Sequence, residues 1–146
     1  MRIPTLFTIG YQGSTPIELV ERLRAAGVER VVDVRELPLS RRAGFSKSQL
    51  AAALASAGIE YEHVRALGNP KANRDRWKSG DREGGAHAFR LHLHDGARAA
   101  LVELADSVQK ETICLLCVEE SHLDCHRSLV AGAIAERLHR VTVVHL

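Results

Sequence analysis

TICLLCVE, residues 112–119, is the most apolar short run in this chain of 146 residues. A short apolar run between polar residues is typical of a strand that is buried on both faces. We therefore place it at the centre of a sheet. Similar runs at 6–11, 30–36 and 141–146 predict further strands, and the alternating run 59–68 predicts an edge strand with one wetter face.

Helix signals lie between these strands. Thr15, Pro16 and Glu18 form a capping signal for a helix that Gly27 ends. Ser46 and Gln49 predict a second capping box. Two more helices are expected at 86–110, with a break at 95–96, and at about 124–138. Residues 69–85 are predicted to be irregular.

Alternation of strands and helices predicts an α/β fold. We expect one domain, 1–146, with three layers: a mostly parallel five-stranded sheet and helices on both faces. No apolar run approaches the roughly 20 residues that cross a bilayer. The start of the chain lacks a secretory signal, and three cysteines do not suggest a disulfide framework. The expected location is cytoplasmic.

Positive charge is concentrated in two segments. Residues 35–47 and 71–82 each carry three more basic than acidic side chains. Such an asymmetry favours an anionic partner, either a small molecule or nucleic acid, although two solvated polar loops would look the same. Trp77 lies among the basic residues of the second segment and could stack on a base or fold back over the core.

The carboxyl ends of parallel strands are where sites form in such sheets. We expect five residues at or just beyond the carboxyl ends of the predicted strands to converge: Tyr11, Arg35, Asn69, Cys117 and Glu119. Cys117 and Cys114 face opposite sides of their strand, which predicts that Cys114 belongs to the core.

The run Cys125-His126-Arg127 follows the central strand closely. If Asp124 caps the next helix, these residues occupy its first turn, where free N–H groups attract anions and lower a cysteine's pKa. Arg127 would add a two-pronged donor for phosphate or carboxylate. The alternative is structural: a buried Cys125, an exposed His126 and an ion-paired Arg127.

Asp33 and Arg35 share a face of their strand because they lie two residues apart. Asp33 could orient Arg35 or a catalytic group, or it could simply cap a neighbouring loop. Arg41 and Arg42 follow in the same basic segment and complete the expected anion-binding loop.

A metal site is an alternative interpretation of the same residues. Cys117 and Cys125 could meet across the loop and, with His126 or His122, bind a metal or act as a redox pair. Their spacing is not a standard zinc spacing, so the sequence favours a site with no metal ligand and no cofactor.

Four blocks carry a resemblance to a family. They are TIGYQGSTPIELVERL (8–23), VVDVRELPLSRRAGFSK (31–47), EYEHVRALGNP (60–70) and LLCVEESHLDCHRSLVAGAIA (115–135). They resemble the bacterial domain-of-unknown-function-488 proteins, although residues 73–85 are less typical. The resemblance implies a small α/β protein with its aspartate-arginine and cysteine-histidine-arginine motifs at one site. It implies no particular reaction.

Three hypotheses follow. The first is an enzyme, such as a thiol-dependent hydrolase or transferase, acting on a phosphate-bearing nucleotide or nucleic acid. In it Cys117 or Cys125 is the thiolate, His126 the general base or acid and Asp33 an orienting group. Substrate contacts are assigned to Tyr11, Arg35, Arg41, Arg42, Asn69, Glu119 and Arg127. The second is a non-catalytic nucleotide- or nucleic-acid-binding module. The third is a metal-binding protein using Cys117, Cys125 and a histidine.

Overall fold

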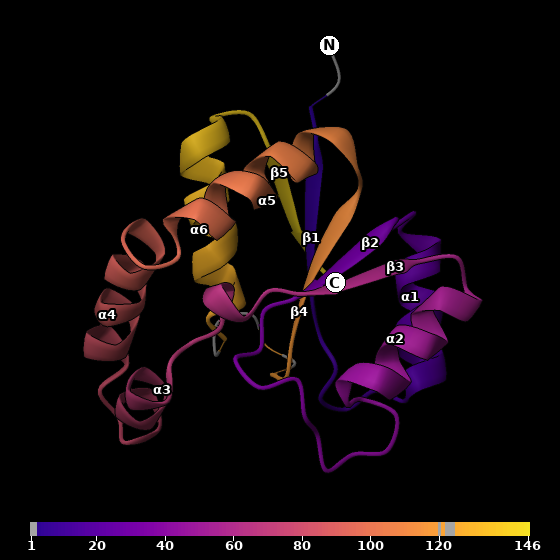
Figure 1. Cartoon of the computed structure of the whole chain (residues 1–146), viewed down its shortest axis with the longest axis horizontal. Helices are drawn as coiled ribbons and strands as arrows, with labels where there is room; N and C mark the ends of the chain where they lie inside the picture. The colour runs from indigo at the N-terminus through magenta and orange to yellow at the C-terminus, as the bar shows by residue number, and fades with distance from the viewer. Residues whose placement is uncertain (1–2, 120, 122–124) are drawn as a thin grey trace.

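A computed structural model describes residues 3–119, 121 and 125–146. Five strands form one sheet in the order β3-β2-β4-β1-β5, and every pairing in it is parallel. The strands are β1 (Thr5–Gly10), β2 (Arg30–Asp33), β3 (Glu60–His63), β4 (Ile113–Cys117) and β5 (Thr142–His145). The predicted sheet is confirmed, with β4 at its centre and β3 at an edge (Figure 1).

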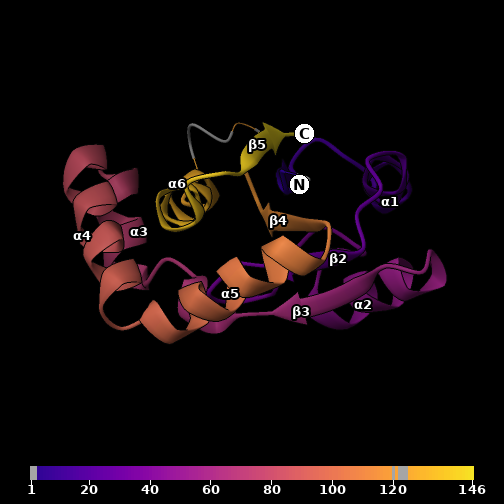
Figure 2. The ribbon, with the colours of Figure 1, turned by 90° about the horizontal axis from the view of Figure 1, so that it is seen from above.

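Helices cover both faces of the sheet, which confirms the three-layer prediction (Figures 1 and 2). Side chains of α1 (Pro16–Ala25) and α2 (Lys47–Ser56) pack on one face. Those of α4 (Arg82–His94), α5 (Arg98–Lys110) and α6 (Arg127–Leu138) pack on the other. None of the helices in the described ranges is long and apolar enough to cross a membrane.

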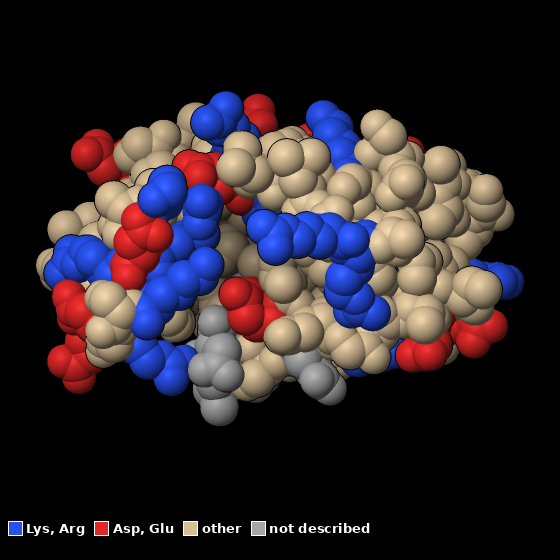
Figure 3. All heavy atoms as spheres, turned by 90° about the horizontal axis from the view of Figure 1, so that it is seen from below, with Lys and Arg blue, Asp and Glu red and all other residues tan. Residues whose placement is uncertain are grey.

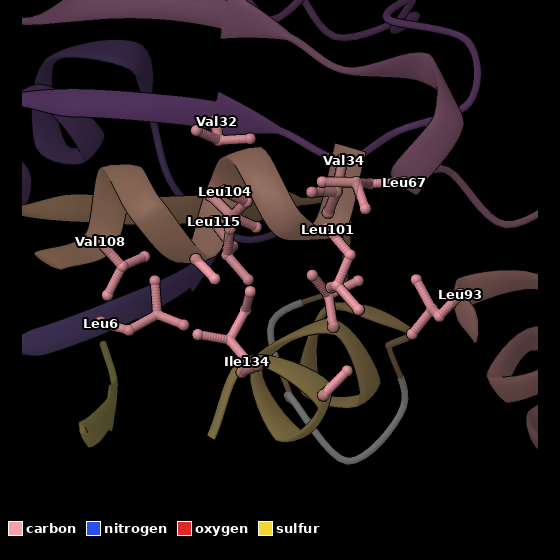
Figure 4. Close-up of a cluster of buried hydrophobic side chains, with 14 of the residues drawn as sticks. Leu6, Val32, Val34, Leu67, Leu93, Leu101, Leu104, Val108, Leu115 and Ile134 are labelled. Carbon is pink, nitrogen blue, oxygen red and sulfur yellow. The ribbon is translucent and has the colours of Figure 1, made fainter. Parts of the chain in front are cut away.

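Alternation along β4 divides the core in two. Ile113, Leu115 and Cys117 belong to the cluster under α4, α5 and α6, part of which Figure 4 shows. Cys114 and Leu116 belong to the cluster under α1 and α2, as expected for residues of opposite parity on a strand. The same parity rule decides where the polar residues beyond the strand ends lie.

Both predicted helix starts exist, but only one cap is formed as expected. Thr15 accepts a hydrogen bond from the Glu18 N–H at 3.2 Å. Ser46 occupies the N-cap of α2 without a side-chain cap bond. Gln49 does not complete the predicted capping box, because its side-chain oxygen accepts from the Gly44 N–H at 3.0 Å instead.

The predicted irregular segment 69–85 is wrong. It contains α3 (Lys71–Lys78) and the first turn of α4, after the short 3₁₀ helix η1 (Arg65–Leu67). Asp81 caps α4 by accepting from the Gly84 N–H at 2.9 Å. Gly85 lets the two helices approach, since a Cβ there would lie 3.2 Å from the Asn73 carbonyl oxygen. Gly85, one of the glycines that suggested a loop, is therefore a packing residue.

Gly10 allows the segment after β4 to cross the end of β1. A Cβ at Gly10 would lie 1.6 Å from the Glu119 carbonyl oxygen. The N–H groups of Tyr11 and Gln12 donate to the carbonyls of Cys117 (3.2 Å) and Val118 (2.8 Å), which extends the β1–β4 pairing beyond the strands. This close approach fixes the position of residues 117–119.

We predict that Gly10→Ala destabilises the protein, because the added methyl group forces the 117–119 backbone to move. Overpacking of this kind lowers the free energy of unfolding by roughly 1–3 kcal/mol. Gly132→Ala is the matched control, since nothing lies within 4 Å of its Cβ position inside α6. That change should be neutral or stabilising by roughly 0.5–1 kcal/mol. Urea denaturation followed by circular dichroism compares them; equal midpoints would contradict the prediction.

Candidate functional site

A cavity of about 310 Å³ opens at the carboxyl edge of the sheet. It is lined by Arg35, Glu36, Leu37, Asn69, Arg74, Trp77, Lys78, Cys117, Val118, Glu119 and His126. Figure 3 views the molecule from this edge and shows Lys and Arg side chains on both sides of a hollow. We call this cavity the edge pocket. Its position agrees with the general rule for parallel α/β sheets.

The two basic segments meet at the edge pocket. Arg74 on α3 donates to the Glu36 carboxylate at 2.7 Å and to the Asn69 carbonyl at 2.9 Å. Gly68 makes this approach possible, because a Cβ there would lie 2.4 Å from Glu36 Cα. Segments that are distant in the sequence thus form adjoining walls.

The floor of the edge pocket is formed by a thiol and an imidazole. Nδ1 of His126 lies 3.7 Å from Cys117 Sγ and 3.8 Å from Cys125 Sγ. Cys117 is 3% exposed and lines the pocket, whereas Cys125 is 1% exposed and lies behind it. Glu119 Oε2 lies 3.6 Å from Cys117 Sγ. The predicted convergence of Cys117, Cys125, His126 and Glu119 therefore occurs.

The His126 ring is fixed by two neighbours. Its Nε2 lies 2.7 Å from the Val34 carbonyl oxygen, a pure acceptor, so Nε2 carries the proton that forms this bond. In the neutral ring the lone pair is then on Nδ1, which faces both sulfurs. The edge of Phe89 meets the ring at a centroid distance of 5.2 Å and an angle of 87°.

The pKa values differ from the sequence-based expectation for a helix N-terminus. Burial, followed by the contact with Cys117, raises the pKa of the Cys125 thiol well above its ordinary value. Burial lowers the pKa of His126, but its contacts with Cys125, the Val34 carbonyl and Glu119 outweigh this effect and raise it overall. Cys125 is therefore not activated by the helix dipole.

The start of α6 explains this difference. The helix begins at Arg127 with His126 at its N-cap, so Cys125 and His126 precede the first turn. The N–H groups of Ser128 and Leu129 donate to the carbonyls of Cys125 and His126 at 3.3 and 2.9 Å. These N–H groups are therefore not free to bind an anion. The proposed cap Asp124, like His122, lies outside the described residues.

Arg127 is completely buried and does not line the edge pocket. It donates to the Glu119 carbonyl at 2.5 Å and to the Thr8 hydroxyl at 3.2 Å. These contacts hold the segment after β4 against α6 and β1. A substrate contact, as predicted from the sequence, would have to displace them.

Asp33 and Arg35 form a second buried cluster, on the α1/α2 side of the sheet. Asp33 accepts from Arg35 Nη2 at 2.6 Å and from the Tyr61 hydroxyl at 2.5 Å. Arg35 also donates to the Phe45 carbonyl at 2.7 Å and lies over the Tyr11 ring, with Cζ 5.3 Å from its centroid. Burial and the bond to Asp33 raise the pKa of Tyr61, so its hydroxyl remains a donor. Only Arg35 of this cluster reaches the edge pocket.

The remaining arginines of the first basic segment lie outside the edge pocket lining. Arg42 donates to the carbonyls of Tyr11 at 3.0 Å and Ser14 at 2.5 Å, and it lies over the Phe45 ring. Arg41 is exposed. Arg42 thus holds two loops together, and the positive wall of the pocket comes mainly from α3.

Sequence reasoning missed part of this wall. The sequence predicts only a basic loop at 71–82, but on α3 Trp77 and Lys78 follow Arg74 by three and four residues, and all three line the edge pocket. Asn69 was predicted and adds an unusual feature. It is 4% exposed, and its Oδ1 has no hydrogen-bond partner among the described residues.

We predict that Asp33→Asn strongly destabilises the fold, because it leaves the Arg35 guanidinium buried without a counter-charge. Loss of one partner of a buried ion pair costs about 3–5 kcal/mol. Asp75→Asn is the control: it breaks an exposed pair with Lys71 and should leave the urea midpoint nearly unchanged. Similar small shifts for both variants would show that another group neutralises Arg35.

Comparison with known proteins gives a family and no characterised relative. No curated protein and no solved structure matches the chain. The model of the domain of unknown function DUF488 matches residues 16–134, which extend from the start of α1 into α6 and include every residue that lines the edge pocket. The resemblance found in the four sequence blocks is therefore confirmed, and the chain belongs to the DUF488 family.

Proposed function

We propose that this protein is an enzyme that acts on a phosphate-bearing substrate, a nucleotide or nucleic acid, bound in the edge pocket. One observation supports this most directly. A cationic and aromatic wall, formed by Arg74, Trp77 and Lys78, faces the same cavity as Cys117 and His126. Anion binding, base stacking and reactive groups thus share one space.

The phosphate would bind at the α3 wall. Lys78 is exposed at the mouth of the pocket, and its ammonium group can reach a bound anion. Arg74 is held in place by Glu36 at 2.7 Å, which orients its guanidinium before a ligand arrives. A preoriented guanidinium loses less conformational freedom when it binds phosphate.

The base would bind beside Trp77 and Asn69. Trp77 is half-buried, and an indole ring at a basic surface offers a stacking platform worth roughly 1–3 kcal/mol per base. The buried Asn69 Oδ1 needs a hydrogen-bond donor, and the amino or imino groups of a base supply one. Leaving such a group unsatisfied costs about 1–3 kcal/mol, so a ligand that satisfies it gains affinity.

The chemical step would take place at the floor of the edge pocket. Cys117 and His126 reach the cavity, and Glu119 lies beside Cys117. Asp33, Tyr11 and Arg127 bond to the chain itself, so we assign them to positioning. Asp33 holds Arg35, and Arg127 holds the carbonyl of Glu119.

Trp77 is the only tryptophan in the chain, so its fluorescence reports directly on the edge pocket. We predict that nucleoside monophosphates quench it saturably and that Lys78→Ala weakens their binding about tenfold, the effect of losing one charge-assisted hydrogen bond of roughly 1.5 kcal/mol. Lys71→Ala is the control, because Lys71 lies on the same helix outside the pocket lining. No quenching by mononucleotides or by short single-stranded DNA and RNA would contradict nucleotide binding.

Conversion distinguishes an enzyme from a binding module that uses the same pocket. We predict that the protein converts at least one of these nucleotides or oligonucleotides, as seen by chromatography, and that Cys117→Ser abolishes conversion while quenching persists. Cys114→Ser is the control, since Cys114 lies on the opposite face of β4. Steeply salt-dependent binding without conversion would favour the non-catalytic module.

A further inference from the structure

Two thiols converge on one imidazole nitrogen at the floor of the edge pocket. Cys117 Sγ, Cys125 Sγ and His126 Nδ1 all lie within 4.8 Å of one another. Nδ1 of the neutral ring has a single lone pair and accepts one S–H hydrogen bond well, not two. Only one thiol can therefore donate to the ring, and Cys117 Sγ has Glu119 Oε2 at 3.6 Å as its other acceptor. A cation between the three atoms would instead engage both sulfurs and Nδ1 together.

The distances fit a tetrahedral metal centre. Zinc bonds of about 2.3 Å to sulfur and 2.0–2.1 Å to nitrogen imply a sulfur–nitrogen separation of roughly 3.6 Å at the tetrahedral angle. The two observed separations are 3.7 and 3.8 Å. The two sulfurs lie within 4.8 Å of each other, and a tetrahedral centre would hold them roughly 3.8 Å apart.

The surroundings of His126 match those of a metal ligand. Histidines that bind metals generally donate their second ring N–H to a carboxylate or a backbone carbonyl. His126 donates from Nε2 to the Val34 carbonyl at 2.7 Å, which directs the Nδ1 lone pair toward the sulfurs. Thiolate and imidazole ligands together favour zinc over the hard cations magnesium and calcium.

We propose that Cys117, Cys125 and His126 bind a zinc ion whose fourth coordination position faces the edge pocket. Cys117 and His126 line that pocket, while Cys125 closes the site from behind. Catalytic zinc sites have this form, with three protein ligands and one position for water or substrate. Cys125 and His126 thus bind the ion together with Cys117, although their sequence spacing is not that of a standard zinc motif.

The role of the ion in catalysis rests on the proposed function; its binding does not. Bound zinc would lower the pKa of a water in the fourth coordination position. That water would transfer a proton to the carboxylate of Glu119, which lies beside Cys117. The hydroxide would attack the substrate's electrophilic atom, and the departing group would take the proton from Glu119. The step is a hydrolysis, with water as the second reactant. It assigns the sulfurs to metal binding in place of nucleophilic attack.

Metal analysis of the full chain tests the site without any nucleotide. We expect about one zinc per chain by mass spectrometry in protein purified without chelators. Cobalt added to the metal-free protein should give thiolate charge-transfer bands and the visible bands of tetrahedral Co²⁺. Cys125→Ser and His126→Ala should reduce the zinc content at least tenfold, whereas Cys114→Ser, a buried thiol outside the cluster, should retain it.

Thiol titration keeps the test decisive if a variant fails to fold. In native wild-type protein, Cys117 and Cys125 should react with a thiol reagent only after a chelator removes the metal. Wild-type protein that is folded, reduced and free of bound zinc or cobalt after reconstitution would overturn the proposal, as would a Cys117–Cys125 disulfide in freshly purified protein. Nucleotide quenching at Trp77 is measured separately, so metal binding without quenching would retain this site and reject the proposed function.

Discussion

The hydrogen bond from His126 Nε2 to the Val34 carbonyl joins segments 92 residues apart, and the edge pocket depends on it. Val34 is itself held, because its N–H donates to the Leu116 carbonyl at 3.1 Å and continues the β2–β4 pairing past the strand. The carbonyl is therefore a rigid acceptor. It fixes the ring orientation of His126, and the ring in turn determines where Nδ1 meets the two sulfurs.

Strand parity explains why the residues that were predicted to form one site lie in two separate clusters. Asp33 and Arg35 have the parity of Val31 and face α1 and α2, whereas Cys117 has the parity of Leu115 and faces α6. Both clusters lie at the carboxyl edge, but the sheet separates them. Arg35 is the member of the first cluster that reaches the pocket of the second. Convergence at one edge therefore does not imply convergence at one pocket.

Much of this arrangement could be predicted from the sequence. The apolar run of β4 and the alternating run of β3 determined their central and edge positions, because burial on two faces or one leaves a direct trace in residue order. The convergence of Cys117 with Cys125-His126 followed from the short connection after β4.

Helix α3 was missed because the neighbouring Pro70, Gly80, Gly84 and Gly85 suggested a loop. Gly84 and Gly85 instead allow close packing between α3 and α4, which is a tertiary effect that local patterns do not record, and Gly80 takes a positive φ in the turn between the two helices.

Hydrogen-bond completeness distinguishes the polar groups at this edge better than residue type does. The carboxylate of Asp33 and the guanidinium of Arg35 are buried, yet their partners within the chain account for their charge. Arg30 Nε, at the other end of β2, also lacks a partner, but the same guanidinium forms ion pairs with Glu60, Glu62 and Glu111. The Asn69 amide oxygen has no comparable compensation among the described residues, and Asn69 lines the edge pocket. The Asn69 oxygen is thus the polar atom of the pocket lining that would gain most from an added hydrogen-bond donor, and it faces the same cavity as Cys117 and His126.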